Sequence, residues 1–433
     1  MIRRHSTRQA YLLCLGDLIS YTLALWFTLL IRYWEIPSWL TILPHLVPFG
    51  LVFLIWIIVF FVADLYGRQS SAFDSRLAET VINAQLAGSF LTIIFFYYVP
   101  FFSITPKITL FLDLILSFAF IFIWRRYGSR SLRRGRAERY LFHCRGSEVD
   151  ELKRELSHNQ KYQAEIIGNQ GSLVRLKPYE VTTLVLNFYD RQTEHEAAAC
   201  YRLMVAGVQV VSVHRLYEEV FGRIPLSSIS EQWFLEHIEH DSGLTYQLVK
   251  RLMDIIAGLI LAIISLPFYP IIALLIFLND RGPLFYREER VGRRGKTFQI
   301  TKWRSMSTEA DLNLRQVTMV GKILRKTRLD ELPQLWSVVR GQQSLIGPRP
   351  ERPEYVAVYG EQIPYYQVRH LITPGLSGWA QIYQERHPHF RLALDETREK
   401  LSYDLYYLKN RSLWLDITIA LKTVRTLLSQ VGV

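Results

Sequence analysis

The sequence predicts a membrane protein in three parts: four transmembrane helices, an α/β domain on a parallel sheet, and a C-terminal α/β domain that begins with a bent membrane helix. Half of the 433 residues are hydrophobic, and the apolar residues are concentrated in long runs. Short apolar segments alternate with polar helical segments between residues 137 and 242, which is typical of a parallel sheet. Prolines interrupt a further apolar run at residues 252–278.

Four apolar runs lie within residues 1–126, and each is long enough to cross a bilayer: 11–31, 45–62, 84–102 and 108–124. A signal peptide is the alternative for the first run. That run is too long for one, and no small-residue cleavage site follows it. We therefore expect a four-helix transmembrane bundle.

Cations indicate how this bundle is oriented. They gather at the N-terminus, in the second connection and after the fourth run, whereas the first and third connections are almost free of them. These cations are Arg3, Arg4, Arg8, Arg68, Arg76, Arg125, Arg126, Arg130, Arg133, Arg134 and Arg136. Loops rich in Arg and Lys stay on the inner side of the membrane, so both ends of the bundle are expected in the cytoplasm.

Three acids fall in or at the ends of these helices: Asp17, Asp64 and Asp113. Intramembrane acids are functional candidates by default. No chain of acids or histidines indicates a proton path, so we favour packing against polar partners, or an interfacial position for Asp64.

Residues 137–242 are expected to form a Rossmann-like cytoplasmic domain, with apolar strands near 140–143, 165–167, 181–186 and 208–213. A dinucleotide site requires G-x-G-x-x-G after the first strand. The turn here, Cys-Arg-Gly-Ser-Glu, keeps one glycine, and Glu148 would repel a pyrophosphate. A structural or regulatory role is therefore favoured, and nucleotide binding is the alternative.

Charge and cysteine content narrow the partners. The formal net charge is +12 and the pI is about 9.5. The cations flank apolar runs, so anionic lipids and phosphates are expected as partners and nucleic acid is not. The cysteines Cys14, Cys144 and Cys200 are far apart, which indicates neither a metal site nor a disulfide framework.

The run at 252–278 is expected to enter the membrane and return. Pro267 and Pro270 break helical hydrogen bonding near its middle. Cations lie at both ends of the run, which favours a cytoplasmic location for both ends. A fifth crossing is the alternative.

Two adjacent carboxylates, Asp330 and Glu331, follow the cationic segment 325–328. Thr327 is predicted to cap a helix here, and Gly341 to end it. An acid at a helix N-terminus is stabilised as the anion. One carboxylate would then act as a nucleophile while its neighbour binds Mg²⁺. Ordinary surface ion pairs are the alternative.

Four cations are candidate phosphate ligands. Lys302 and Arg304 lie on one face of a predicted strand, where two cations form a diphosphate clamp. Arg349 lies in the rigid segment Gly-Pro-Arg-Pro, which suits bidentate phosphate binding. Arg325 is the fourth candidate.

An ordered set of motifs covers roughly the last 190 residues, about the length of one domain. They are KRLMD at 250–254, GPLFY at 282–286, ERVG at 289–292, KWRSM at 302–306, RKTRLDELPQL at 325–335, GPRP at 347–350, PG at 374–375, GWAQ at 378–381, YD at 403–404 and YY at 406–407. Together they resemble the bacterial sugar transferase family, the monotopic phosphoglycosyl transferases that act on polyprenyl phosphate.

This resemblance implies an undecaprenyl-phosphate sugar phosphotransferase. Such an enzyme moves a sugar 1-phosphate from a UDP-sugar to undecaprenyl phosphate and releases UMP. It implies that Asp330 attacks the diphosphate to form a covalent phosphosugar intermediate and that Glu331 assists with Mg²⁺. It implies that Lys302, Arg304, Arg325 and Arg349 neutralise phosphate charge.

The resemblance also implies a catalytic domain at 247–433 with a re-entrant helix, on the cytoplasmic face of a bacterial inner membrane. The product would begin an exopolysaccharide, capsule or O-antigen repeat. The chain departs from the family pattern where Leu266 precedes Pro267, where Thr373 replaces a lysine, and at residues 382–385. The last departure leaves room for a different sugar.

Several alternatives stay open. A glycosyltransferase that moves only the sugar would release UDP, and a non-catalytic scaffold for polysaccharide export would release no nucleotide. A homodimer is compatible with the sequence. The segments 369–370 and 374–381 are expected to close the site, with a structural role favoured for His370 over that of a general base. The tail, 403–428, is predicted as an interfacial helix or a core helix.

Overall fold

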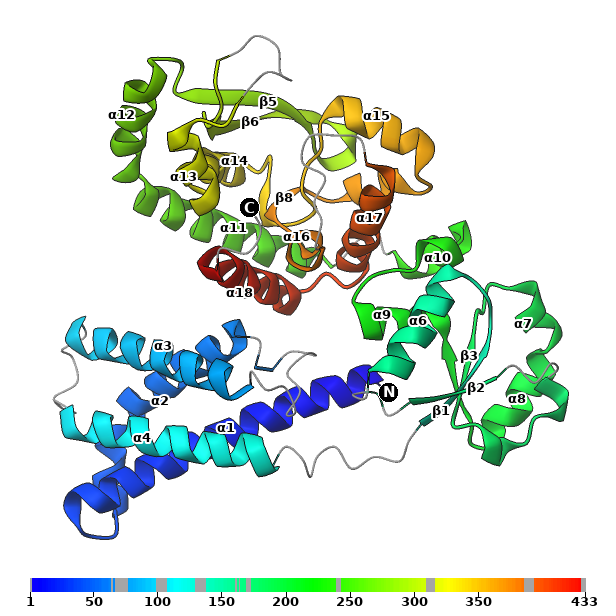
Figure 1. Ribbon diagram of the computed structural model, residues 1–433, viewed down its shortest axis with the longest axis horizontal. Helices are drawn as coiled ribbons and strands as arrows, with labels where there is room; N and C mark the ends of the chain where they lie inside the picture. Colours follow the sequence, from blue (N-terminus) through cyan, green and yellow to red (C-terminus); the bar gives the residue numbers. More distant parts are fainter. Residues whose placement is uncertain are drawn as a thin grey trace. The chain divides into compact units, whose positions relative to one another are not determined.

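The structure, a computed structural model (Figure 1), describes residues 2–63, 65–66, 77–98, 107–128, 138–159, 162, 164–168, 173–238, 243–308, 316–384 and 393–429. The chain divides into two compact units, Met1–Glu138 with His158–Glu165 and Arg139–Ser157 with Ile166–Val433. Some predicted positions lie outside the described residues: Asp64, Arg68, Arg76, Arg130, Arg133, Arg134, Arg136 and Glu385.

The first unit contains helices at the four predicted apolar runs. They are α1 (Ile2–Tyr33), α2 (Trp39–Val62), α3 (Leu77–Tyr98) and α4 (Lys107–Ile123), which ends in the π-helical turn η1 (Trp124–Gly128). Apolar side chains from all four of these helices, including Tyr21, Trp56, Val81 and Ile121, form a shared buried cluster.

Two of the described helices are long and apolar enough to cross a membrane, through Tyr11–Tyr33 and Trp39–Val62. Helix α3 contains a shorter apolar segment, Val81–Phe96. Length and composition thus support a crossing by α1 and by α2, and crossings by α3 and α4 stay predictions.

Of the three acids predicted in or at the ends of these helices, the two that the structure describes, Asp17 and Asp113, differ in their surroundings. Asp17 is buried and pairs with Arg125, whose Nε lies 3.0 Å from Asp17 Oδ1. Tyr66 donates to Asp17 Oδ2 at 2.8 Å. Asp113 is equally buried, and within the described part of the chain neither of its oxygens has a hydrogen-bond partner. Polar packing was the favoured interpretation, and it holds for Asp17.

The first part of the second unit contains a parallel sheet of order β2-β1-β3-β4. The strands β1, β3 and β4 are paired in parallel. The elements are β1 (Glu138–His143), α6 (Ser147–His158), β2 (Ala164–Ile167), η2 (Leu173–Arg175), η3 (Pro178–Glu180), β3 (Thr183–Leu186), α7 (Arg191–His195), α8 (Ala197–Val205), β4 (Gln209–Ser212), α9 (Val213–Phe221), η4 (Leu226–Ser228) and α10 (Glu231–His237). The predicted parallel α/β pattern is confirmed.

The turn after β1 is occupied by the protein itself. Glu148, in the first turn of α6, accepts a hydrogen bond from the Ser227 N–H at 3.0 Å. The N-terminus of α6 is where a bound pyrophosphate would lie. A segment of the chain therefore already contacts this position.

The second part of this unit holds the motifs of the sequence analysis. Its elements are α11 (Leu244–Ser265), α12 (Phe268–Asp280), β5 (Phe285–Val291), η5 (Arg293–Gly295), β6 (Thr297–Trp303), α13 (Met319–Thr327), η7 (Leu329–Gln334), α14 (Leu335–Arg340), β7 (Ser344–Ile346), α15 (Pro353–Gln362), η8 (Tyr366–Leu371), β8 (Gly375–Ser377), α16 (Trp379–Tyr383), α17 (Leu394–Lys409) and α18 (Leu413–Ser429). Helix α17 is largely buried, and its residues Leu401, Leu405 and Tyr407 belong to the main core cluster of this part.

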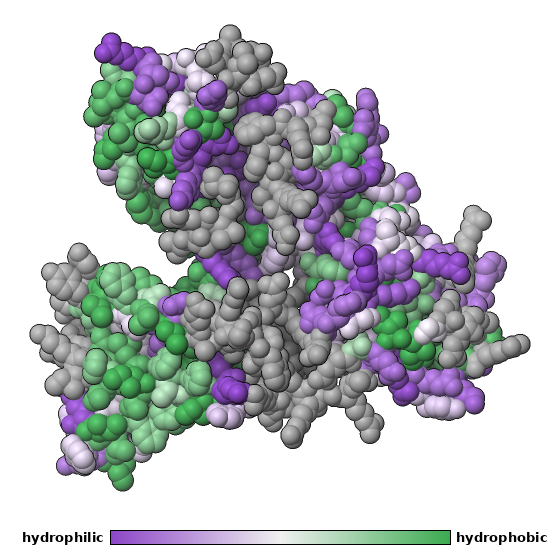
Figure 2. All heavy atoms as spheres, in the orientation of Figure 1, coloured by the Kyte–Doolittle hydropathy of each residue, from purple (hydrophilic) through white to green (hydrophobic). Residues whose placement is uncertain are grey.

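The predicted break at Pro267 is present. Helices α11 and α12 meet at an angle of 56° around Leu266 and Pro267. Ser265 closes the end of α11 by donating from Oγ to the Ala262 carbonyl at 2.7 Å. Both helices expose large apolar side chains, such as Ile264 and Leu274, and the surface at α12 is hydrophobic in Figure 2.

The tail has features of both predicted roles. Helix α18 buries Ile419 completely in the core cluster. It exposes Trp414, Val424 and Leu427 on its surface. One side of α18 thus packs into the core. Its exposed apolar side chains are suited to a membrane interface.

Candidate active site

The helical segment that carries the acid pair starts differently from the sequence prediction. Thr327 is the last residue of α13, and its hydroxyl donates back to the Ile323 carbonyl at 2.8 Å. The predicted cap at Thr327 is therefore wrong. Arg328 follows in the left-handed conformation, φ +58°, and turns the chain into the short 3-10 helix η7. A non-glycine residue holds this conformation only where its surroundings enforce it.

The other local prediction, that Gly341 ends the helix, is correct. Pro333 lies inside η7, and α14 follows with Leu335 and Val338 buried. Gly341 ends α14 at φ +86°, where a side chain would be strained. Arg251 in α11 also caps α14, because its guanidinium donates to the Val338 and Val339 carbonyls at 2.7 Å each.

Asp330 is buried beside Glu331. Its Oδ1 is a buried oxygen that has no hydrogen-bond partner in the described part of the chain. Burial, together with the Glu331 charge, raises the pKa of Asp330 to about 6. The sequence predicted the opposite shift from the helix N-terminus. Loss of water outweighs the helix dipole here, because an ion in a low-dielectric site loses most of its solvation.

Glu331 has the opposite environment. Its Oε1 accepts from Lys302 Nζ at 3.1 Å and from Arg349 Nη2 at 2.7 Å. Although burial opposes the effect, the Arg349 and Lys302 charges hold the pKa of Glu331 well below its usual range. The two neighbouring acids are thus different: Glu331 is an anion paired with two cations, and Asp330 has a buried oxygen without a partner in the described part of the chain.

Lys302 reaches the site from a two-stranded antiparallel hairpin. Strands β5 and β6 pair Tyr286 with Lys302 and Glu288 with Ile300, so Lys302 and Glu288 share one face. Burial lowers the pKa of the Lys302 ammonium. This lysine therefore lies inside the site, not on a solvated surface.

The other two predicted cations are placed differently. Arg325 is half-buried on α13 and close enough to Asp330 to lower its pKa. Arg304 lies past the end of β6 and pairs with Asp280 at the end of α12. Its Nε also donates to the Pro283 carbonyl at 2.5 Å. The structure brings Lys302 and Arg349 to the acid pair, and it does not bring Arg304 there.

Arg349 is presented by a tightly packed loop. Gly347 lies so close to Thr373 and Gly375 that a Cβ would come within 2.7 Å of the Thr373 carbonyl oxygen. The Gly347 N–H donates to the Ser377 carbonyl at 2.8 Å. The loop that carries Arg349 is thus packed directly against the β8 region.

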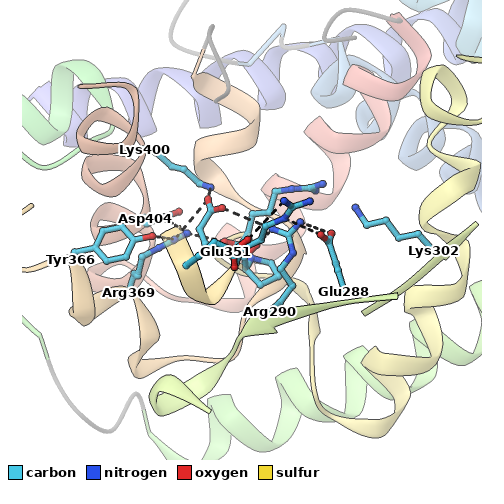
Figure 3. Close-up of polar contacts among 12 residues, drawn as sticks. Glu288, Arg290, Lys302, Glu351, Tyr366, Arg369, Lys400 and Asp404 are labelled. Atoms are coloured by element: carbon cyan, nitrogen blue, oxygen red, sulfur yellow. Dashed lines mark hydrogen bonds and ion pairs between the residues drawn. The ribbon is translucent and has the colours of Figure 1, made fainter. Parts of the chain in front are cut away.

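A further network of buried and partly buried charges contacts the loop that carries Arg349, and Figure 3 labels most of its members. Its members alternate in sign and come from β5, the 349–352 loop, η8 and α17: Glu288, Arg290, Glu351, Arg352, Arg369, Lys400 and Asp404. Of these residues only Arg369 had an expected role, in the segment predicted to close the site, and the sequence indicated none for the others. The clues were the charges at Glu351 and Arg352 directly after the GPRP motif, and Asp404 within the YD motif.

His370 lies in η8, where it is buried and its Nδ1 is 3.1 Å from Gln367 Oε1. Burial and the neighbouring Arg369 lower the pKa of His370 to about 3. A histidine that stays neutral and packs against Tyr366 fits the structural role favoured by the sequence.

Mg²⁺ is usually bound through one or two carboxylates plus substrate phosphates. No cluster of three or more His, Cys, Asp or Glu side chains suited to a metal ion occurs among the described residues. The buried Oδ1 of Asp330, which has no hydrogen-bond partner among the described residues, fits the role of a carboxylate ligand. Glu331 is a weaker fit because Lys302 and Arg349 already bind its Oε1. The residues present fit an ion that is shared with the phosphates of a substrate.

The family model for bacterial sugar transferases matches residues 245–430. The chain is 37% identical over 239 residues to a UDP-N-acetylgalactosamine-undecaprenyl-phosphate N-acetylgalactosaminephosphotransferase of Aeromonas hydrophila, covering 53% of this chain and 55% of that protein. The chain therefore spans about half the length of this relative.

Two other relatives are covered more fully. The chain is 38% identical over 188 residues to a UDP-glucose:undecaprenyl-phosphate glucose-1-phosphate transferase of Caulobacter vibrioides, covering 42% of this chain and 70% of that protein. It is 37% identical over 188 residues to the exopolysaccharide production protein PSS of Rhizobium leguminosarum bv. phaseoli, covering 41% of this chain and 93% of that protein.

Proposed function

Because the chain belongs to the bacterial sugar transferase family, we propose that it moves a sugar 1-phosphate from a UDP-sugar to undecaprenyl phosphate and releases UMP. The observation that carries this proposal is the contrast within the acid pair. Asp330 has a buried oxygen with no hydrogen-bond partner among the described residues, whereas Glu331 is held by Lys302 and Arg349. A buried carboxylate with an unpartnered oxygen near cations suits nucleophilic attack on a phosphate.

The reaction has two steps. The Asp330 carboxylate attacks the phosphorus bonded to the sugar, the bond between the two phosphates breaks, and UMP leaves. A phosphate oxygen of undecaprenyl phosphate then attacks the same phosphorus. The bond to Asp330 breaks, which yields the lipid diphosphate sugar and restores the carboxylate.

In this proposal the cations stabilise the negative charge of the phosphates during both steps. Lys302 and Arg349 orient Glu331 and lie where they can neutralise phosphate oxygens, and Arg325 adds positive charge near Asp330. Bound Mg²⁺, held by Asp330 with Glu331 nearby, would supply further charge neutralisation on the diphosphate.

The membrane assignment follows from α11 and α12. Their 56° bend at Pro267, the cations at both ends and the apolar surfaces of both helices support a re-entrant helix. A helix that returns to its starting side keeps residues 247–433 on the cytoplasmic face, where UDP-sugars are found. We place the protein in a bacterial inner membrane, with four transmembrane helices in the first unit.

The remaining assignments are less specific. The parallel sheet supports a Rossmann-like domain at 137–242, and the contact between Glu148 and Ser227 favours a structural role over nucleotide binding. The product would begin an exopolysaccharide, capsule or O-antigen repeat, and the name of the Rhizobium relative supports the first of these. A homodimer stays compatible with this proposal.

The test is to identify the released nucleotide. Purified protein in lipid nanodiscs is incubated with undecaprenyl phosphate, Mg²⁺ and a panel of UDP-sugars. We expect UMP from one donor, loss of UMP in Asp330→Asn, and no change in the exposed control Asp395→Asn. UDP as the product would contradict the proposal and indicate transfer of the sugar alone. An absence of any nucleotide from the whole panel would favour the scaffold.

Mass spectrometry tests the intermediate separately. Without the lipid acceptor, the peptide that contains Asp330 should gain the mass of a sugar phosphate. Adding undecaprenyl phosphate should remove this mass. UMP release without any such adduct would contradict the two-step reaction while leaving the overall transfer intact.

A further inference from the structure

We infer that Arg369 is a positioning residue for the transfer reaction: it fixes the main chain of Arg349 and thereby sets where the Arg349 guanidinium meets Glu331 and the substrate phosphates. This inference rests on the proposed function. It concerns a residue for which the sequence indicated only a general location near the site.

The loop that carries Arg349 is held at three successive carbonyls. Arg369 Nη2 donates to the Arg349 carbonyl at 2.8 Å. Arg290 Nη1 donates to the Pro350 carbonyl at 3.0 Å. The Val291 N–H donates to the Glu351 carbonyl at 2.9 Å. The Arg369 contact is the one made at the functional residue itself.

Arg369 is itself held in place from several sides. It is 3% exposed, and Nη2 also contacts Asp404 Oδ2 on α17 at 2.8 Å. Its Nη1 donates to the Tyr366 hydroxyl at 2.9 Å and lies 4.0 Å from Glu351 Oε1. Figure 3 shows Arg369, Asp404 and Glu351 grouped around the same point.

Simple core stability does not require such an arrangement. A buried ion pair gains little over well-packed apolar side chains, because both charges lose water. What an ion pair provides is direction, because a planar guanidinium places its donors at fixed angles. Here one guanidinium joins α17, η8 and the Arg349 main chain. The arrangement therefore sets a position.

The position matters because Arg349 is a long side chain that must reach Glu331. Functional groups need their supports fixed to about 0.5 Å, and a displacement of about 1 Å can reduce a rate about 100-fold. Arg349 is 30% exposed, so packing alone does not fix its end. Anchoring its backbone removes one source of freedom.

A double-mutant cycle tests the inference by activity. We expect Arg369→Lys to lower kcat by about 10- to 100-fold while the donor KM changes by less than about threefold. In an Arg349→Lys background, the same change should lower kcat by less than about threefold, because the residue through which Arg369 acts is already altered. The exposed control Arg398→Lys should change neither value. Equal losses in both backgrounds would overturn the inference.

A milder variant guards against misfolding. Asp404→Asn keeps the shape beside Arg369 and removes its charge partner. It should lower kcat by several-fold, again only when Arg349 is intact. Full activity of both Asp404→Asn and Arg369→Lys would contradict the positioning role.

Hydrogen exchange separates this inference from the proposed function. In Arg369→Lys, amide exchange over residues 347–351 should speed up by about tenfold or more relative to the α14 segment, as local opening becomes easier. Unchanged exchange would overturn the inference whatever the activity. If the wild type releases no UMP, the proposed function fails, and the exchange result alone decides whether Arg369 holds the loop.

Discussion

Asp17 in the first unit and Asp330 in the second are both fully or almost fully buried, and both lie near arginine side chains. They differ in how their oxygens are used. Both oxygens of Asp17 accept hydrogen bonds, from Arg125 and from Tyr66. Asp330 Oδ1 accepts none from the residues that the structure describes. Burial alone therefore does not separate the two acids, whereas an unpartnered oxygen near cations makes Asp330 the candidate for a functional group.

The cations account for this difference. At Asp17 the guanidinium binds the acid itself, and Arg125 Nη1 also donates to the Leu65 carbonyl at 2.7 Å. In the second unit, Lys302 and Arg349 bind the neighbour Glu331. Glu331 thus takes the neutralising contacts, and Asp330 Oδ1 has no partner among the described residues.

The largest expected effect is on catalysis by Asp330→Asn. An amide is no nucleophile, so UMP release should fall by about 1,000-fold or more, the scale of losses when a nucleophile is removed. Folding should be unharmed, because the change removes a buried charge that has an unpartnered oxygen. Thermal unfolding and UMP release measured on the same preparation check both statements. A clear loss of stability would show that Asp330 is a structural acid like Asp17.

The converse change, Asp17→Asn, should act on stability alone. It leaves the Arg125 charge buried with one partner fewer, and breaking a buried pair typically costs about 3–5 kcal/mol. The melting temperature in detergent should fall, while kcat per folded molecule stays at the wild-type value. The matched change Asp113→Asn removes a buried carboxylate without such a pair and should not lower stability. Lost kcat in a folded Asp17→Asn protein would contradict a purely structural role.

A pH series should separate the two members of the acid pair. The pKa of Asp330 is about 6, and attack requires its anion. The rate kcat/KM should therefore fall about tenfold per pH unit below this value. The fall should be measured with saturating Mg²⁺ at each pH.

The contribution of Asp330 to folding stability should rise as pH falls, whereas kcat/KM falls. The folded state binds the Asp330 proton more tightly than the unfolded state, whose value is near 3.8. Between pH 4 and 6 this group therefore makes the folded state more stable as pH falls. Glu331, with a depressed pKa, contributes stability above its unfolded value that is lost as pH falls through its folded one. In Asp330→Asn the stabilising slope between pH 4 and 6 should disappear, and its persistence would assign the slope to another group.

Much of the fold follows from the sequence because its signals are local. Apolar runs locate α1–α4, alternating segments locate the parallel strands β1, β3 and β4, and Pro267 locates the bend. The acid pair and Arg349 also stand out, because their motifs are continuous in the chain.

What the sequence does not predict depends on distant partners. Thr327 was expected to cap a helix because of its spacing to Asp330, yet α13 runs through it. The raised pKa of Asp330 depends on burial, which a motif does not specify. Arg369 and Asp404 form an ion pair although they lie far apart in the sequence. Arg304 has the spacing of a clamp with Lys302, but Asp280 binds it instead.

Substitution of Arg304 is expected to have the smallest effect on catalysis. It extends the comparison between side chains whose polar atoms are all bound by the protein and those with an unpartnered atom. Its Nε and Nη1 donate to the Pro283 and Met306 carbonyls, and both Nη atoms contact Asp280. Like Arg125, it is an arginine engaged by its own protein. In the functional protein, Arg304→Lys should therefore change the donor KM by less than about threefold, whereas Lys302→Met should raise it by about tenfold or more, as expected for loss of a charged contact. A large rise of KM in Arg304→Lys would return Arg304 to the phosphate site and show that its contact with Asp280 opens when the donor binds.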